Sequence, residues 1–355
     1  MGAAAAGREE TAMRALRVLR NGPPGEVCEV AEIPIPEPGP GQLRVRVAAG
    51  SLNFNDIDRC HGRVTTIPMP PPFTLGMDVC GVVDAAGAGA EPWVGRRVVA
   101  ITHMAQGGLA EYALAPVDAV FEAPESLDDA EAAAFLLPFH TTHLALFRRA
   151  RLEPGETLLV HSGASGLGTA AIQLGVAKGA RVLATAGGAE KARLCRELGA
   201  ELAIDHREQD FAAAVLDHTR EVGADVVCDL AGGDFSEKSW RCTAREGRYL
   251  CVGFADDPKN GFTPRALRPL CPANISVVGV MLAYIENLPP ALRRMGMNPF
   301  GRRVGDEVHA DLLRLLAEKR IRPIVGQRVS LEEAGRALDA HEQRRTAGRT
   351  VVLVA

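Results

Sequence analysis

The spacing of apolar residues changes along the chain and divides it into three stretches. From Ala15 to about Pro124, short apolar runs are separated by turns rich in proline and glycine, which predicts β-strands. Within this stretch Leu43–Ala48 alternates apolar and polar residues, so we expect a half-buried strand there. The pattern then becomes helical, because Ser126–Asp129 offers an N-cap and acidic first-turn residues ahead of Ala130–Leu137.

Strand-like and helix-like segments alternate from Thr157 to about Val280. The expected strands are 157–162, 180–185, 201–205, 224–230, 247–253 and 275–280. The expected helices are 166–178, 189–198, 208–221, 235–244 and 265–270. This alternation predicts a parallel sheet with helices on both faces. The rest of the chain is mixed again, with expected helices at 306–319 and 330–343 and strands at 323–328 and 349–354.

The predicted fold class is α/β, with a doubly wound parallel sheet inserted into a β-rich domain. We expect residues 1–12 to form a flexible extension and residues 138–281 to form the domain of the parallel sheet. Residues 13–137 and 282–355 are expected to pack together as the second, catalytic domain. Ligands of such folds bind in the cleft at the carboxyl ends of the strands, so we look for site residues there.

The segment 158–171 has the layout of a dinucleotide-binding turn: an apolar run, a glycine-rich turn and a helix-forming run of small residues. Glycine lets the backbone approach a pyrophosphate and lets the helix pack tightly against its strand. The N–H groups at the helix start then face the phosphate charge. The residues expected to bind the cofactor here are Ser162, Gly163, Ala164, Ser165, Gly166, Leu167 and Gly168.

The residues after the next expected strand favour NADP(H) over NAD(H). NAD binders carry an Asp or Glu about 20 residues past the glycines, where it binds the ribose hydroxyl. No acidic residue lies between Lys178 and Ala189, and Lys191 follows in the first turn of the next expected helix. The helix dipole disfavours a lysine there unless an anion such as a 2′-phosphate lies nearby. Alternatively, Lys191 is a solvated surface residue with no particular partner.

Composition and charge are those of an ordinary globular protein. The chain has 355 residues, of which 47% are hydrophobic, and its net charge of −4 gives no reason to expect nucleic acid or an anionic membrane as partner. No apolar run is long enough to cross a bilayer, and the first residues lack the basic and apolar regions of a signal peptide. The eight cysteines form no Cys-x-x-Cys pair, so we expect buried, reduced thiols in a cytoplasmic protein.

Several short motifs, taken together, resemble the medium-chain dehydrogenase/reductase superfamily, and within it the zinc-independent quinone-oxidoreductase-like branch. They are Leu52–Asp56, Leu75–Val83, Gly95–Val98, Gly107–Tyr112, Pro138 with Thr141, the glycine turn and Leu198–Ala200. The resemblance implies a GroES-like catalytic domain beside a Rossmann domain. It also implies NADPH-dependent reduction of a quinone or an α,β-unsaturated carbonyl, and a homodimer built through the Rossmann domain.

The sister branch, the zinc alcohol dehydrogenases, holds its catalytic metal with three protein ligands. Met77 stands where that branch has a ligating His, Ser51–Asp56 contains no Cys, and Val99–Gly107 lacks the cysteines of a structural zinc lobe. His140 and His143 could share a metal, but their surroundings fit a helix entry better. We therefore expect no metal, and hydrogen-bonded structural roles for three more histidines, His61, His103 and His161.

The resemblance implies a role for several single residues, and each has a structural alternative. Asn53 would donate a hydrogen bond to a substrate oxygen, or else hold a local turn. Asp56 would help to solvate the cleft or fix its loop, and we favour the structural role. Thr141 would contact the cofactor, cap a helix, or do both. His206 would stack or hydrogen-bond near the adenosine, or be a plain loop residue. Two further residues, Gly253 and Phe254, complete the expected cofactor site.

The chain departs from its relatives where many of them have a tyrosine close to the reacting centre; Asp58 stands in that region. Enoyl-thioester reductases of the superfamily use this tyrosine as proton donor, whereas here water, Asp58 or His61 could supply the proton. Besides a quinone or enone reductase, which we favour, an enoyl-thioester reductase and a non-catalytic NADPH-binding protein stay open, and a zinc alcohol dehydrogenase is favoured least. A basic entrance for a phosphopantetheine arm would favour an enoyl-thioester reductase. The residues that could form such an entrance are Arg302, Arg303, Arg344 and Arg345.

Overall fold

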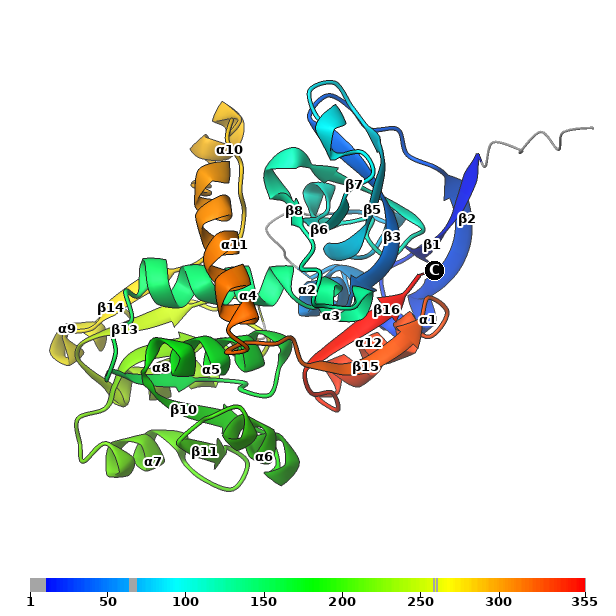
Figure 1. The fold of residues 1–355 in the computed structure, drawn as a ribbon. Helices are drawn as coiled ribbons and strands as arrows, with labels where there is room; N and C mark the ends of the chain where they lie inside the picture. The colour runs from blue at the N-terminus through cyan, green and yellow to red at the C-terminus, as the bar shows by residue number, and fades with distance from the viewer. Residues whose placement is uncertain (1–10, 64–68, 258, 260, 355) are drawn as a thin grey trace, which may run out of the picture.

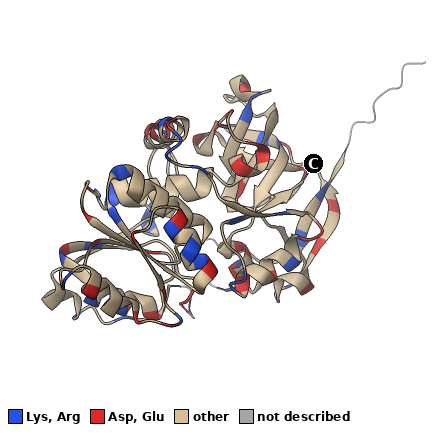
Figure 2. Ribbon diagram, turned by 60° about the horizontal axis from the view of Figure 1, so that its bottom comes forward, with Lys and Arg blue, Asp and Glu red and all other residues tan. Residues whose placement is uncertain are grey.

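Two lobes make up the molecule, each built around its own large β-sheet (Figure 1). The fold is seen in a computed structural model, which describes residues 11–63, 69–257, 259 and 261–354. Residues 1–10, most of the expected extension, lie outside the described part, and Ala12 already begins a strand. Lys and Arg lie interspersed with Asp and Glu over both lobes (Figure 2).

The first lobe contains a six-stranded sheet in which all neighbouring strands run parallel. Its strands are β9 (Thr157–Val160), β10 (Arg181–Ala186), β11 (Leu202–Asp205), β12 (Ala224–Asp229), β13 (Thr243–Cys251) and β14 (Ser276–Gly279). They lie in the order β11-β10-β9-β12-β13-β14, which is the order of a doubly wound dinucleotide-binding sheet. The predicted α/β fold class is therefore confirmed.

The helices of this lobe are α5 (Gly166–Lys178), α6 (Ala189–Glu197), α7 (Phe211–His218), α8 (Asp234–Arg241) and α9 (Leu270–Ala273). The prediction for 166–178 matches both ends of α5. The helix expected at 265–270 was wrong, because the helical turn begins only after Pro269. Proline lacks the N–H that a helix interior needs, so Pro269 is tolerated at the start of α9 and not inside an earlier helix.

The second lobe is β-rich and contains a seven-stranded sheet and a three-stranded sheet. The large sheet consists of β15 (Val325–Ser330), β16 (Arg349–Leu353), β3 (Gln42–Ser51), β5 (Asp78–Ala86), β6 (Arg97–Ile101) and β8 (Val120–Glu122), with β7 (Tyr112–Pro116) paired to β3. The small sheet consists of β2 (Cys28–Pro34), β1 (Ala12–Val18) and β4 (Phe73–Thr74). The last strand β16 pairs with β3, so the C-terminal segment lies in one sheet with the N-terminal part.

Short helices connect the strands of the β-rich lobe. They are α1 (Pro24–Val27), α2 (Phe54–Cys60), α3 (Asp129–Ala133) and α12 (Ala334–Glu342), with 3₁₀ turns at Glu91–Trp93, His103–Ala105 and Val117–Ala119. The alternating segment predicted as a half-buried strand is part of β3, where Leu43, Val45 and Val47 are buried. All eight cysteines are free thiols; five are buried, Cys28 and Cys251 are half-buried, and Cys271 is exposed.

Two further helices lie near the junction of the lobes: α4 (Leu136–His143), which continues as a π-helical stretch over Leu144–Arg149, and α11 (Arg302–Ala317). The short helix α10 (Pro290–Arg294) lies at the far end of α11 (Figure 1). Helix α4 is buried along its whole length, and α11 packs against it (Figure 1). Apolar residues of α11 and of the parallel-sheet lobe belong to one hydrophobic cluster, among them Val308, Leu312 and Ile172.

A buried chain of hydrogen bonds fixes α4 to its surroundings. Nδ1 of His140 lies 3.0 Å from the Tyr284 hydroxyl, and its Nε2 lies 3.1 Å from Nδ1 of His309. His309 Nε2 lies 3.0 Å from the backbone carbonyl oxygen of Glu122 and can only donate to it. Both ring nitrogens of His140 are thus occupied within the protein. Burial lowers the pKa of His309 to about 4, and the pKa of His140 is also lowered, so both rings stay neutral near pH 7.

Neutral buried histidines make the fold sensitive to acid. Burial also lowers the pKa of His161 to about 4. Because the folded pKa values lie below the unfolded value, this part of the stability is present above about pH 6.5 and is lost as the pH falls.

We expect the unfolding free energy, measured by urea unfolding, to be lower at pH 5 than at pH 7.5 by about 2 kcal/mol for each such ring. His309→Gln should flatten this pH dependence, whereas His103→Gln, at an exposed position, should not; an unfolding free energy that is constant from pH 7.5 to pH 5 would contradict the prediction.

Candidate active site

The glycine turn links β9 to α5 by close backbone contacts. A Cβ on Gly168 would lie 2.2 Å from the carbonyl oxygen of Ser162, and one on Gly163 would lie 2.8 Å from Sγ of Cys195. The Ser165 hydroxyl caps α5 by accepting a hydrogen bond of 3.1 Å from the Gly168 N–H. The turn therefore brings the start of a 13-residue helix close to the strand, with a cradle that a side chain would fill.

This turn also contacts the β-rich lobe. The N–H of Gly348 donates a hydrogen bond of 2.8 Å to the carbonyl oxygen of Ala164. A Cβ on Gly166 would lie 2.3 Å from Cδ of Arg349, so the arginine side chain packs directly against the turn. Leu167, the next residue of the expected set, is half-buried in the first turn of α5. The dinucleotide cradle and the β-rich lobe thus meet at the start of β16.

Cationic side chains gather where β10 ends. Lys191 is the third residue of α6, and its Nζ donates a hydrogen bond of 2.6 Å to the backbone carbonyl of Arg344. Burial, followed by the charges of Arg207 and Arg344, lowers the pKa of Lys191. The nearby carboxylate of Asp205 accepts hydrogen bonds from the backbone N–H groups of Gly188 and Arg207. The repulsion between the three cations Lys191, Arg207 and Arg344 favours an anion among them.

A hollow of about 250 Å³ lies beside these cations, at the end of β11. Its lining includes His206 and the rings of Phe211 and Phe235. The two phenylalanine rings stack with centroids 5.3 Å apart, and the His206 ring lies 5.1 Å from Phe235. Flat aromatic walls of this kind suit a planar heterocycle.

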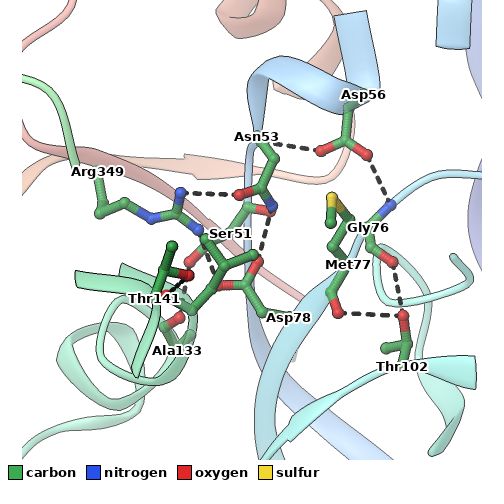
Figure 3. A network of polar contacts seen from close by, with 11 residues as sticks. Ser51, Asn53, Asp56, Gly76, Met77, Asp78, Thr102, Ala133, Thr141 and Arg349 are labelled. Atoms are coloured by element: carbon green, nitrogen blue, oxygen red, sulfur yellow. Dashed lines mark hydrogen bonds and ion pairs between the residues drawn. The ribbon is translucent and has the colours of Figure 1, made fainter. Parts of the chain in front are cut away.

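The loop before α2 is held by a buried network of polar groups (Figure 3). The Asn53 amide donates to Oδ1 of Asp78 over 2.7 Å and to the Ser51 carbonyl over 3.1 Å, and its oxygen accepts from Arg349 over 2.9 Å. Arg349 also pairs with Oδ2 of Asp78 over 2.8 Å, and the side chains of both are at most 5% exposed. Both N–H bonds of the Asn53 amide are occupied here, which fits its alternative role in holding the loop; donation to a substrate stays a prediction.

Asp56 lies beside this network and binds backbone rather than facing an open space. Its carboxylate accepts from the Asn53 N–H over 2.9 Å and from the Gly76 N–H over 3.3 Å. The side chain is fully buried, and burial raises the pKa of Asp56 to about 6. These contacts are those of a residue that fixes the start of α2, as favoured above.

Thr141 lies inside α4 and does not cap it, because the helix already begins at Leu136. The expected alternative of an N-cap is therefore wrong. Its hydroxyl donates a hydrogen bond of 2.6 Å to the Leu137 carbonyl, one turn earlier in the same helix. The side chain points toward the Arg349 network in Figure 3. Contact with a cofactor stays a prediction.

A second hollow, of about 190 Å³, lies between α2 and the segment after β13. It is lined by Phe54, Asp58, Arg63, Phe254, Ala255, Asp256 and Asp257. Gly253 is fixed just before it, because its N–H donates to the Asp229 carbonyl and a Cβ there would lie 2.4 Å from the Leu230 carbonyl oxygen. We refer to this hollow as the α2 hollow.

Other histidines are hydrogen-bonded, as expected. His61 pairs with Glu342, His103 with Gln42, and His161 with Thr185 and Ser239. His143 lies 2.9 Å from Asp311. Within the described ranges, no three His, Cys, Asp or Glu side chains gather as a set that could hold a metal ion.

Sequence reasoning missed Asp78 and Arg349 as members of the site. Each is a charged residue at the start of a run that is otherwise apolar or small and forms a buried strand. A charge is rarely buried without a partner, so two such residues of opposite sign could have been paired on that ground.

Comparison with known proteins identifies the family. A model described as "Alcohol dehydrogenase GroES-like domain" matches residues 39–125, and one described as "Zinc-binding dehydrogenase" matches residues 166–296. A quinone oxidoreductase of Pseudomonas aeruginosa is 33% identical over 330 residues, which are 92% of this chain and 96% of that protein. The chain belongs to the medium-chain dehydrogenase/reductase superfamily. Its relatives place it in the quinone-oxidoreductase-like branch, as the motifs predicted.

Solved structures of the superfamily resemble this one over nearly the whole chain. A mycobacterial protein complexed with NADPH has a TM-score of 0.83 at 29% identity, covering 96% of this chain and 100% of its own. A quinone oxidoreductase of Pseudomonas syringae has a TM-score of 0.83 at 28% identity, with the same coverage. Among the described residues, no helix of this superfamily member is both long and apolar enough to span a membrane.

The Arg349–Asp78 pair predicts a large loss of stability when one partner is removed. Arg349→Met should lower the unfolding free energy by about 3–5 kcal/mol, because it leaves the Asp78 carboxylate buried without its cation. Urea unfolding followed by circular dichroism measures the effect. Arg328→Met is the matched control, since that arginine is 47% exposed and its pair with Asp128 should be worth at most about 1 kcal/mol. Equal losses in the two variants would show that the buried pair contributes no more to the unfolding free energy than the exposed pair does.

Proposed function

We propose that the protein is an NADPH-dependent oxidoreductase that transfers a hydride to a quinone or an α,β-unsaturated carbonyl without a metal ion. The observation that carries the proposal is the contact between the glycine turn and Arg349. Since Arg349 also holds Asn53, one side chain links the dinucleotide cradle to the loop that begins α2. The α2 hollow follows directly along that helix.

The residues of the cradle fit NADPH. The turn Ser162–Gly168 and the start of α5 would hold the pyrophosphate, and Lys191 with Arg207 would hold the 2′-phosphate. The hollow at His206 would take the adenine, while Thr141, Gly253 and Phe254 would border the nicotinamide. When bound, NADPH supplies the hydride and its two electrons. The protein itself orients the acceptor, keeps water away and supplies polar groups to the reduced product.

The acceptor class follows from the donor set that the chain offers. Met77 occupies the place of a zinc ligand in the sister branch, and a thioether does not suit a site of Cys, His and carboxylate. Quinones and conjugated enones are electrophilic enough to accept a hydride without Lewis-acid activation. The names of the relatives support the same acceptor class.

Two of the four basic residues considered for a phosphopantetheine entrance, Arg302 and Arg344, are engaged elsewhere, whereas Arg303 and Arg345 are exposed. Arg302 donates to the carbonyl oxygens of Val117 and Val120 and pairs with Asp306. Arg344 pairs with Asp256 and lies over the Phe54 ring. These contacts favour a small acceptor over a thioester arm.

Steady-state kinetics over three acceptors test the proposal. We expect NADPH oxidation with a simple quinone and with an enone, and kcat/KM at least tenfold lower with an enoyl thioester of coenzyme A. Elemental analysis of the same preparation should find transition metal far below one atom per chain. NADPH binding without turnover of any acceptor would indicate a non-catalytic protein, and a stoichiometric zinc ion would overturn the metal-free mechanism.

Lys191→Glu tests the cofactor assignment. The variant places a carboxylate where a 2′-phosphate would lie, so the KM for NADPH should rise at least tenfold and the KM for NADH should hardly change. Lys319→Glu, at an exposed position at the end of α11, is the control and should change neither constant. Equal effects of Lys191→Glu on both cofactors would reject the assignment of this lysine.

We also propose a homodimer formed along the outer strand of the parallel sheet. Strand β14 is the last strand in the sheet order. Val277 on this strand is 47% exposed, and Met281 just after it is 37% exposed. An apolar edge strand offers unpaired backbone groups to a second copy. Light scattering after gel filtration should give twice the chain mass, and Val277→Lys should shift the protein toward monomer. A monomeric wild-type protein would contradict the proposal.

A further inference from the structure

Asp58 carries a buried carboxyl oxygen that has no hydrogen-bond partner. It is the fifth residue of α2, and its side chain is 3% exposed. Oδ1 accepts a hydrogen bond of 3.1 Å from Nη1 of Arg63, whereas Oδ2 is buried without a partner among the described residues. A buried carboxylate oxygen without a donor is costly, so this position favours either a protonated carboxyl or a polar group brought in by a ligand.

The unpartnered oxygen belongs to a residue that lines the α2 hollow. The lining combines the apolar rings of Phe54 and Phe254 with the polar groups of Asp58 and Arg63. The residues come from both lobes, namely from α2 and its C-terminal continuation and from the segment after β13. An acceptor of the proposed class would be held by such rings, next to the carboxyl groups of Asp58, Asp256 and Asp257.

The other acids and proton donors near this cleft are already engaged. Asp256 pairs with Arg344, and Asp257 accepts hydrogen bonds from Thr263 and Arg265. Asp56 binds two backbone N–H groups, and both amide hydrogens of Asn53 are donated within the protein. His61 lies 3.0 Å from a carboxylate oxygen of Glu342. Of the three sources that sequence reasoning left open for the proton, Asp58 is the side chain that lines the hollow and also has an unpartnered oxygen.

We propose that Asp58 is the catalytic acid that protonates the reduced acceptor. This inference rests on the proposed function, in which NADPH is the reductant. Hydride transfer leaves an enolate or a hydroquinone anion; the O–H bond of Asp58 then breaks, a C–H or O–H bond of the product forms, and the electron pair stays on the carboxylate. Arg63 stabilises that carboxylate until it takes a new proton from solvent. In the overall reaction, the acceptor, NADPH and one proton give the dihydro product and NADP⁺.

Charged groups from several elements surround this acid and set its proton affinity. Arg63 and His61 follow α2, and Glu342 lies at the end of α12. Asp256 and Asp257 line the hollow from the other lobe, and Arg344 pairs with Asp256 and lies over the Phe54 ring. Burial is the largest effect and raises the pKa of Asp58. The Arg63 guanidinium opposes this shift, and the Glu342 carboxylate, which pairs with Arg63 over 2.8 Å, adds to it. An acid with a raised pKa stays protonated closer to neutral pH, as general acids require.

The pH dependence of kcat with an enone tests the role of Asp58. Wild-type kcat should fall as the pH rises through the pKa of Asp58, because the acid is lost. Asp58→Asn should lower kcat about 100-fold and remove this fall, with an unchanged dissociation constant for NADPH in a fluorescence titration. Asp58→Glu should regain part of kcat together with the pH dependence. Asp84→Asn is the matched control and should behave as wild type, because Asp84 lies on β5 and its carboxylate pairs with Arg44.

Two charge variants give a readout that a merely structural residue would not. Arg63→Gln removes the cation that favours the carboxylate, so the fall of kcat should move to higher pH; Glu342→Gln should move it to lower pH. If the wild type turns over but Asp58→Asn keeps its kcat and pH profile, this inference alone is overturned. If both charge variants leave the profile in place, the inference is also overturned. A wild type that reduces no acceptor overturns this inference and the proposed function together.

Discussion

The buried ion pair between Arg349 and Asp78 is the interaction on which the rest of the site depends. It joins the first residue of β16 to the first residue of β5, and it holds the amide of Asn53 between them. A buried pair of this kind is stabilised when its remaining donors and acceptors are also bonded, and Asn53 bonds one further atom of each partner, while Nε of Arg349 stays buried without a partner among the described residues. The loop before α2 is therefore fixed both by this distant ion pair and by its local hydrogen bond from the Asn53 N–H to Asp56.

Much of the fold could be predicted from the sequence, because its signals are local. The period of apolar residues located the strands of the parallel sheet to within a few residues, and the glycine turn followed by a run of small residues located α5. The helix expected at 265–270 was wrong because Pro269 interrupts the helical pattern. The fold class needed only the alternation of the two periods.

The chemistry of the site was less accessible to sequence reasoning, because it depends on pairs that are distant along the chain. Arg349 and Asp78 are 271 positions apart, and Lys191 meets the carbonyl of Arg344 across 153 positions. The order of the motifs could place Asn53 and Asp56 in one loop. It could not show that the side-chain amide of Asn53 donates both its hydrogen bonds within the protein, to Asp78 and Ser51. Nor could it distinguish Asp56, with its bonded oxygens, from Asp58, with its unbonded one.

The hydrogen bond from Gly348 to Ala164 has a mechanical consequence. It ties the two lobes together beside the glycine turn, where the side chain of Arg349 also leaves no space. Any rigid-body rotation of one lobe against the other must then pivot close to this point, because displacement there would break the bond. A second tie between the lobes lies beside the α2 hollow, where Arg344 donates hydrogen bonds to the Ala255 carbonyl and to the Asp256 carboxylate. Rotation about the first tie would break the second, so the two together hold the cradle and the walls of the hollow in one fixed relation.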